Sequence, residues 1–241
     1  MSNPFISIWR KEFYALFSGW LGFFILLVYL VLSLGMCFFA GDFFRINNQA
    51  LFSFFRFQPE ILALLVPAVS MPLWTDESRR GTIDFLLSQP VKYATAVMAK
   101  FAAAWSFGAV MLLCTLPLAF VSSFYIRLDW QNIVLAYVAV WLVIGAFAAV
   151  GSIISALSSN PVLTYVCSFF CAWMLLELNP SVLFSWVARR FKGQVSVVLD
   201  FRSEYADMIA GQLALNNLIY FGLIIILSLW LNVVIIANKK N

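Results

Sequence analysis

The chain has 241 residues, of which 63% are apolar and 11% charged, and its formal net charge is +4. This composition is far more apolar than that of a soluble domain and predicts an integral membrane protein. A helix needs about 20 apolar residues to cross a hydrocarbon core of about 30 Å, so the spans would use most of the chain and exclude a separate soluble catalytic domain. The sequence has no histidine, the commonest general base and metal ligand, and its four cysteines lie in apolar blocks, which favours packing over metal binding.

The N-terminal part is predicted to lie on the membrane before the chain first crosses it. Residues 1–18 place Trp9 and Phe13 on one helical stripe and Lys11 on the opposite one, which is the pattern of an interfacial helix. The following apolar run, 20–40, is long enough to be the first span, and we expect it to be retained rather than cleaved.

The second predicted span covers residues 59–74 and contains several prolines. Pro67 and Pro72 lie in its inner part and each lacks a backbone N–H, so we expect the helix to be kinked or broken there. The Phe-rich segment before it, 41–58, is interpreted as aromatic anchoring at the membrane surface in preference to a substrate site.

Two further spans follow the polar stretch after this one. The third, 95–124, is longer than a bilayer needs, with Pro117 available to kink it and Lys100 able to extend toward the membrane surface. The fourth, 133–157, repeats small residues four apart, which predicts close helix contact. The candidate packing or subunit-interface residues are Gly145, Ala149, Gly151 and Ser155. The pattern leaves open whether the neighbouring helix belongs to this chain or to a second subunit.

The last two predicted spans enclose a polar segment. The fifth span, 162–178, ends near Glu177, for which we prefer a structural role to proton or cation handling because it lies at the edge of the span. The segment 181–216 is expected to hold one or two short helices on the outer side. The sixth span, 218–237, is followed by lysines, which are typical of the cytoplasmic side.

The stretch 76–91 is the longest strongly polar interruption between apolar blocks in the first half of the chain. Asp76 and Glu77 favour a helix N-terminus, Arg80 lies four residues after Asp76, and Gly81 can end the helix. Thr82 can cap a second short helix, whose apolar side chains are contributed by Ile83, Phe85, Leu86 and Leu87. The stretch therefore predicts a small amphipathic element of the kind that docks into a groove on a partner protein.

The pattern Glu77, Gly81-Thr82, Asp84, Leu86-Leu87 and Pro90-Val91, between a second and a third span, resembles the signature of type 2 ABC transporter permeases. Within that family it is most similar to the gliding-motility-associated branch and its nitrous-oxide-reductase maturation relatives. The resemblance implies an all-α membrane protein with an interfacial N-terminal helix, six spans and a cytoplasmic coupling helix. It also implies a multi-pass protein of the bacterial inner membrane with both termini in the cytoplasm.

The resemblance further implies that this stretch inserts into a cleft of a cytoplasmic ABC ATPase dimer, which binds ATP and magnesium. The candidate ATPase-coupling residues are Asp76, Glu77, Arg79, Arg80, Gly81, Thr82, Asp84, Phe85, Leu86 and Leu87. No glycine in the chain has a second glycine at the spacing of a phosphate-binding loop, so the chain is expected to bind no cofactor and to hydrolyse no ATP by that route.

The expected function is that of a permease subunit in an ATP-driven exporter-type complex with a second permease subunit, the same or related. Besides the ATPase and membrane lipid, the outer segment 181–216 could contact an envelope partner. The alternative is a complex that transmits force or signal to envelope machinery without moving a substrate. An intramembrane enzyme or a proton-coupled carrier is disfavoured, because acids at span depth are limited to Glu60 and Glu177 near one edge.

Overall fold

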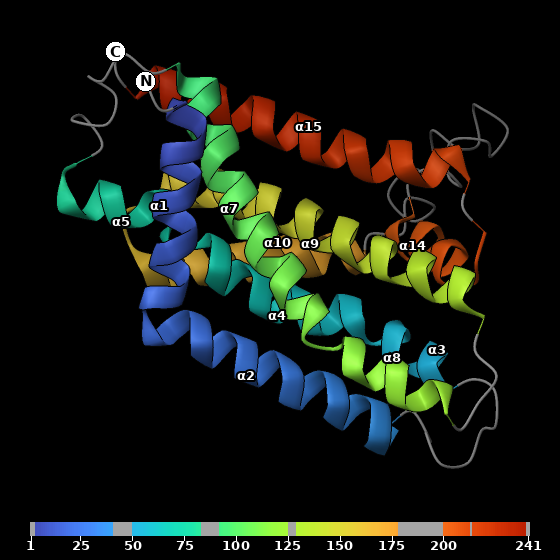
Figure 1. The fold of residues 1–241 in the computed structure, drawn as a ribbon. Helices are drawn as coiled ribbons and strands as arrows, with labels where there is room; N and C mark the ends of the chain where they lie inside the picture. Colours follow the sequence, from blue (N-terminus) through green and yellow to red (C-terminus); the bar gives the residue numbers. More distant parts are fainter. Residues whose placement is uncertain are drawn as a thin grey trace, which may run out of the picture.

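The computed structural model describes residues 3–40, 50–82, 92–124, 129–177, 200–212 and 214–239. All regular elements in these ranges are helical, and most run side by side in one bundle, while α1 crosses one end of it (Figure 1). In chain order they are α1 (Pro4–Ser18), α2 (Trp20–Gly35), the π-helix η1 (Met36–Ala40), α3 (Ala50–Arg56), α4 (Gln58–Ser70), α5 (Pro72–Arg80), α7 (Tyr93–Leu113), α8 (Leu116–Ser123), α9 (Trp130–Leu157), α10 (Pro161–Glu177), α14 (Phe201–Ile209) and α15 (Leu215–Asn238).

Within the described residues, four helical stretches are long and apolar enough to cross a membrane. They are Trp20–Phe39, Tyr93–Ser123, Trp130–Leu157 and Leu215–Asn238, and they correspond to the first, third, fourth and sixth predicted spans. The all-helical, multi-pass class is therefore confirmed. The second predicted span corresponds to α4 and the start of α5, and the fifth to α10, an apolar helix of 17 residues.

The expected proline breaks are present. Helix α4 ends at Ser70 and α5 begins at Pro72, which confirms the break in the second predicted span, whereas Pro67 lies inside α4 without ending it. The third predicted span is divided between α7 and α8, and Pro117 occupies the first turn of α8. Proline is tolerated in a first helical turn because the N–H groups there have no intrahelical acceptor.

Helix α9 is the centre of the bundle and packs against α15, α4, α10, α7, α5 and α14. Its small residues allow this close packing. A Cβ on Gly151 would lie 2.1 Å from the Ser70 hydroxyl of α4, and one on Gly145 would lie 2.9 Å from the Trp105 ring nitrogen of α7. Ala149 and Ser155 are completely buried. The small-residue face of α9 therefore contacts helices of the same chain. This is one of the two alternatives that the sequence left open.

A hydrogen bond between buried polar side chains joins the two helices of most extensive contact, α9 and α15. The amide nitrogen of Asn232 on α15 donates to the Ser152 hydroxyl on α9 over 2.8 Å. Both side chains are at most 1% exposed. The bond lies within helices that are otherwise strongly apolar, where a polar pair has no water as an alternative partner.

Helix α1 meets α2 at a sharp corner. Gly19 between them is extended, with φ −86° and ψ 141°. A Cβ on Gly22 would lie only 1.9 Å from the carbonyl oxygen of Leu16, so the first turn of α2 requires a glycine there. On the N-terminal side of this corner, α1 packs along α7. The ring nitrogen of Trp9 donates to the Ser106 hydroxyl over 3.2 Å.

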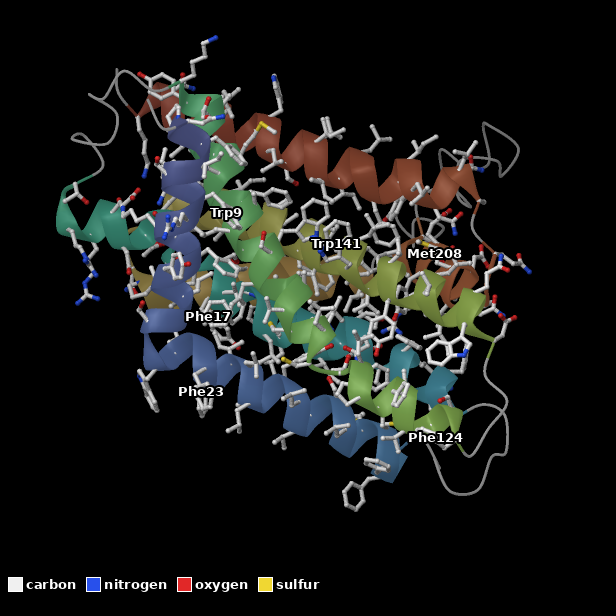
Figure 2. All side chains as sticks on the ribbon, in the orientation of Figure 1. Trp9, Phe17, Phe23, Phe124, Trp141 and Met208 are labelled. Atoms are coloured by element: carbon white, nitrogen blue, oxygen red, sulfur yellow. The ribbon has the colours of Figure 1, made fainter. Side chains whose placement is uncertain are left out.

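Aromatic side chains fill the bundle and also cover its outside. Trp141 lies among the helices, whereas Phe23 on α2 and Phe124 after α8 point away from them (Figure 2). The rings of Trp105 and Trp141 stack with centroids 4.0 Å apart, which joins α7 to α9. The outward faces of α2, α10 and α15 expose many large apolar side chains, as expected of helices that contact lipid.

Candidate coupling site

Helix α5 carries the first residues of the predicted coupling stretch. It begins at Pro72, so Asp76 and Glu77 lie in its middle and not at an N-terminus, which corrects the sequence prediction. The reason is the proline itself: its fixed φ suits a first helical turn, and the helix restarts immediately after the break. The expected i,i+4 pair is present, with Arg80 and Asp76 3.9 Å apart.

The C-terminus of α5 is closed as the sequence predicts. Gly81 is left-handed, with φ 66°. Its N–H donates to the carbonyl of Ser78 over 3.3 Å, and the N–H of Thr82 donates to that of Glu77 over 3.0 Å, which together form a glycine-terminated helix end. The second short helix expected after Thr82, with Asp84, Phe85, Leu86 and Leu87, lies outside the described residues.

The start of α5 is held by a serine from the central helix. The N–H groups of Trp74 and Thr75 donate to the Ser155 hydroxyl oxygen over 2.9 and 3.1 Å. That hydroxyl donates in turn to the carbonyl of Met71 over 2.7 Å. Ser155 therefore satisfies backbone groups that the break at Pro72 separates, and the Thr75 hydroxyl adds a 3.1 Å contact with Thr164 on α10.

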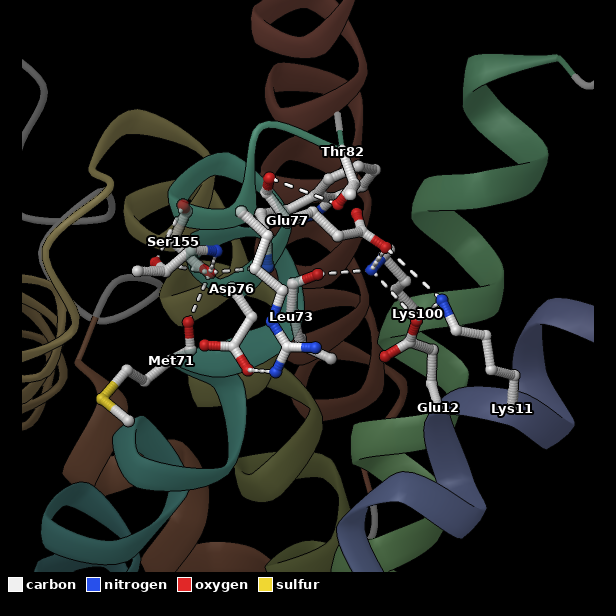
Figure 3. A network of polar contacts seen from close by, with 12 residues as sticks. Lys11, Glu12, Met71, Leu73, Asp76, Glu77, Thr82, Lys100 and Ser155 are labelled. Atoms are coloured by element: carbon white, nitrogen blue, oxygen red, sulfur yellow. Dashed lines mark hydrogen bonds and ion pairs between the residues drawn. The ribbon is translucent and has the colours of Figure 1, made fainter. Parts of the chain in front are cut away.

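A cluster of charged side chains, Lys11, Glu12, Glu77 and Lys100, lies beside α5 and is called here the Lys100 cluster (Figure 3). The Lys100 ammonium is 2.9 Å from a Glu77 carboxylate oxygen and 3.1 Å from one of Glu12. It also donates to the carbonyl of Leu73 and lies 4.8 Å from the centre of the Trp74 ring.

Lys100 is 1% exposed, so its ammonium is enclosed by other groups of the protein. An isolated ammonium would be costly to bury, but two carboxylates and a carbonyl surround this one. The side chain thereby joins three elements: α7, which carries it, α1 through Glu12, and α5 through Glu77. Sequence reasoning missed this pairing. The available signals were a single lysine within an apolar run and a single acid in the N-terminal helix.

The predicted coupling residues on α5 divide between two faces. Glu77 points toward the Lys100 cluster, and its side chain is 13% exposed. Arg79 and Arg80 are exposed to solvent, and the Asp76 side chain is 45% exposed. The inward face is bonded to the bundle, and the outward face is more exposed.

A second charged cluster consists of Glu60, Glu177 and Arg202. Helix α14, which carries Arg202, lies at the end of the bundle opposite α5 (Figure 1). Arg202 on α14 is 3.0 Å from Glu60 on α4 and 2.6 Å from Glu177 at the end of α10. The hydroxyl of Tyr205 also donates to the backbone of α3 at Phe55. These contacts fasten α14 across helix ends, and they agree with a structural role for Glu177.

The described residues form an all-helical, multi-pass type of bundle, and the charged helix α5 lies at one end of it. A family model described as ABC-2 family transporter protein matches residues 56–238, which is most of the chain, so the chain belongs to that family. Membership in a transporter permease family implies partnership with an ABC ATPase. No curated protein matches the chain.

Proposed function

We propose that this chain is the permease subunit of an ATP-driven exporter-type complex and that α5 receives the movement of the ATPase. The observation that carries the proposal is the division of α5 into an exposed charged face and a face bonded to α1, α7 and α9. A helix attached in this way cannot be displaced without breaking these bonds or moving its neighbours. ATP and magnesium would be bound by the partner ATPase.

The Lys100 cluster is the proposed connection between α5 and the rest of the bundle. Bonds to Lys100 link the α5 carboxylate of Glu77 with the α1 carboxylate of Glu12. Movement of α5 would therefore reach both the N-terminal helix and the span that contains α7. The Ser155 hydroxyl provides a second connection, to α9.

The remaining features of the proposed complex are those that the sequence resemblance implies. Six crossings would require two more spans beside the four long helices, one formed by α4 with the start of α5 and the other by α10. Both termini would lie on the cytoplasmic side of the inner membrane, the side of α5. A second permease subunit, the same or related, would complete the complex. Similarity to the gliding-motility branch and roles for Asp84, Phe85, Leu86 and Leu87 stay predictions.

The test of ATPase docking uses two arginines at opposite ends of the bundle. Arg79→Glu, on the exposed face of α5, should abolish co-purification with the co-expressed cognate ATPase. Arg56→Glu, exposed on α3, is the matched control and should retain it. If Arg79→Glu and Leu86→Asp together leave co-purification unchanged, α5 and the stretch after it are not the docking element.

The alternative function is transmission of force or signal without a transported substrate. The observation that favours it is α14, which Arg202 connects directly to the ends of two bundle helices. A partner bound to α14 would thereby act on α4 and α10. Reconstituted vesicles distinguish the two functions: ATP-dependent movement of lipid or polymer supports export, whereas ATPase activity that responds only to an outer partner supports transmission.

A further inference from the structure

A cleft of about 570 Å³ separates α1 and α2 from α5, a size typical of small-molecule sites. One part of its wall is apolar, with Leu16, Leu21 and Ile25 among the lining residues. Another part is charged and includes Lys11 from α1 and Arg80 from α5. The cleft is therefore amphipathic, and it has an apolar side and a charged side.

The position of the cleft matches the surface of the bilayer. Helix α2 begins a candidate span at Trp20, whose side chain is 81% exposed at the corner with α1. Tryptophan is enriched at the membrane–water boundary. Leu21 and Ile25 follow along the same span, so the apolar wall leads from this boundary toward the hydrocarbon.

Two cationic side chains, Lys11 and Arg80, line opposite sides of the cleft. Within the described part of the chain, neither makes a close hydrogen bond to a carboxylate. Lys11 lies 3.6 Å from Glu12 and 3.8 Å from Glu77, and Arg80 lies 3.9 Å from Asp76. These separations exceed the usual hydrogen-bond range. The side chains of Lys11 and Arg80 are 67% and 75% exposed, so their N–H groups can reach an anion.

The balance of positive and negative charges in the cleft indicates which kind of ligand it would bind. Three basic and three acidic residues line the cleft: Lys11, Arg80, Lys100, Glu12, Asp76 and Glu77. A bound phosphate alone would leave an excess negative charge, whereas a head group that also carries an ammonium would keep the balance. Asp76, whose side chain is 45% exposed, offers a carboxylate to that ammonium.

We propose that the cleft binds one zwitterionic glycerophospholipid from the adjoining leaflet. Its phosphate contacts Lys11 and Arg80, its ammonium contacts Asp76, and an acyl chain lies along Leu21 and Ile25. The lipid would fill the space between the N-terminal helix and α5. Lipid binding can be measured with the permease chain alone. The proposal can therefore be tested separately from the proposed ATPase docking.

The experiment measures phosphatidylethanolamine bound to the purified full-length chain by native mass spectrometry during titration from detergent. The double variant Lys11→Gln with Arg80→Gln should weaken binding about tenfold or more, because it removes both phosphate contacts. The matched control is Arg10→Gln with Arg79→Gln, which removes the same charge from neighbouring positions that do not line the cleft. The control should bind as the unmodified chain does.

Two competitors identify the part of the lipid that is recognised. Phosphatidylglycerol with the same acyl chains should bind more weakly, because it lacks the ammonium. Glycerophosphoethanolamine, the head group without acyl chains, should not displace the lipid at equal concentration. Equal loss in both double variants, equal binding of phosphatidylglycerol, or displacement by the free head group would each overturn the proposal. Equal loss in both double variants would indicate that the lipid is attracted by the positive charge of the surface in general. Displacement by the free head group would indicate a soluble phosphate ligand.

Discussion

The ammonium of Lys100 lies 2.9 Å from a carboxylate oxygen of Glu77, which bonds a fully buried lysine of α7 to the inward face of α5. Glu12 of α1 is the second carboxylate, at 3.1 Å. The two acids come from different helices, so each connects Lys100 to a different part of the bundle. The stability of the bundle at this end should therefore depend on the lysine that both acids share.

Replacing Lys100 with methionine should destabilise the chain by about 3–5 kcal/mol, because two largely buried carboxylates would lose their common partner. The measurement is unfolding in mixed micelles. Lys92→Met, an exposed lysine just before α7, is the control and should change stability little. Adding Glu12→Gln and Glu77→Gln to Lys100→Met should restore much of the loss. Equal stability of the Lys92 and Lys100 variants would show that the cluster contributes nothing.

Replacing Ser155 with alanine should loosen the junction of α4 and α5. The N–H groups of Trp74 and Thr75 would lose their acceptor, at a cost of about 1–3 kcal/mol for each buried group. Hydrogen exchange at these two amides should become faster. Ser123→Ala, which removes an exposed hydroxyl from α8, should leave both rates unchanged. If the rates match in the two variants, the serine does not hold the junction.

Two glycines of α2 should respond oppositely to alanine. Gly22→Ala would bring a Cβ to 1.9 Å from the Leu16 carbonyl, so it should force α1 away from α2 and destabilise the chain. Gly35→Ala meets no atom within 4 Å and should be neutral or stabilising by up to about 1 kcal/mol. Melting temperatures of the two variants provide the comparison. A Gly22 variant as stable as the Gly35 variant would contradict the close corner.

The carboxyl of Glu204 on α14 should make stability depend on pH. Burial raises its pKa, and the nearby acids Asp207 and Asp200 raise it further. The folded state therefore favours the protonated form, so its contribution is greatest below the ordinary pKa of a glutamate and is lost as pH rises through the raised pKa. Glu204→Gln should increase the melting temperature at pH 7 and flatten its dependence on pH above about 4.5. Asp207→Asn should produce a smaller change in the same direction, and a Glu204 variant with an unchanged pH profile would contradict the assignment.

Local patterns in the sequence were sufficient for the helices and their breaks. Apolar runs predicted the four long spans, Pro72 predicted the break before α5, and Gly81 predicted its end. Each of these features depends on neighbouring residues. The start of α5 was misplaced because Asp76 and Glu77 resemble a helix N-terminus, whereas the helix had already restarted at Pro72.

The charged clusters depend on residues far apart in the chain. Glu12 and Lys100 are separated by 88 positions, and Glu60 and Arg202 by 142. Periodicity and spacing report which face of a helix is apolar, but not which acid will meet a given base. The burial of Lys100 and the attachment of α14 therefore required the structure.

The hydrogen bond between Asn232 and Ser152 sets the axial register of α15 against α9. A one-residue screw displacement of α15, which combines sliding with rotation, would bring Leu231 or Val233 to this position and leave the serine without that amide. Sliding is therefore opposed at this point, whereas tilting about it keeps the bond. The pair therefore fixes the position of α15 along α9 more strongly than it fixes the angle between the two helices.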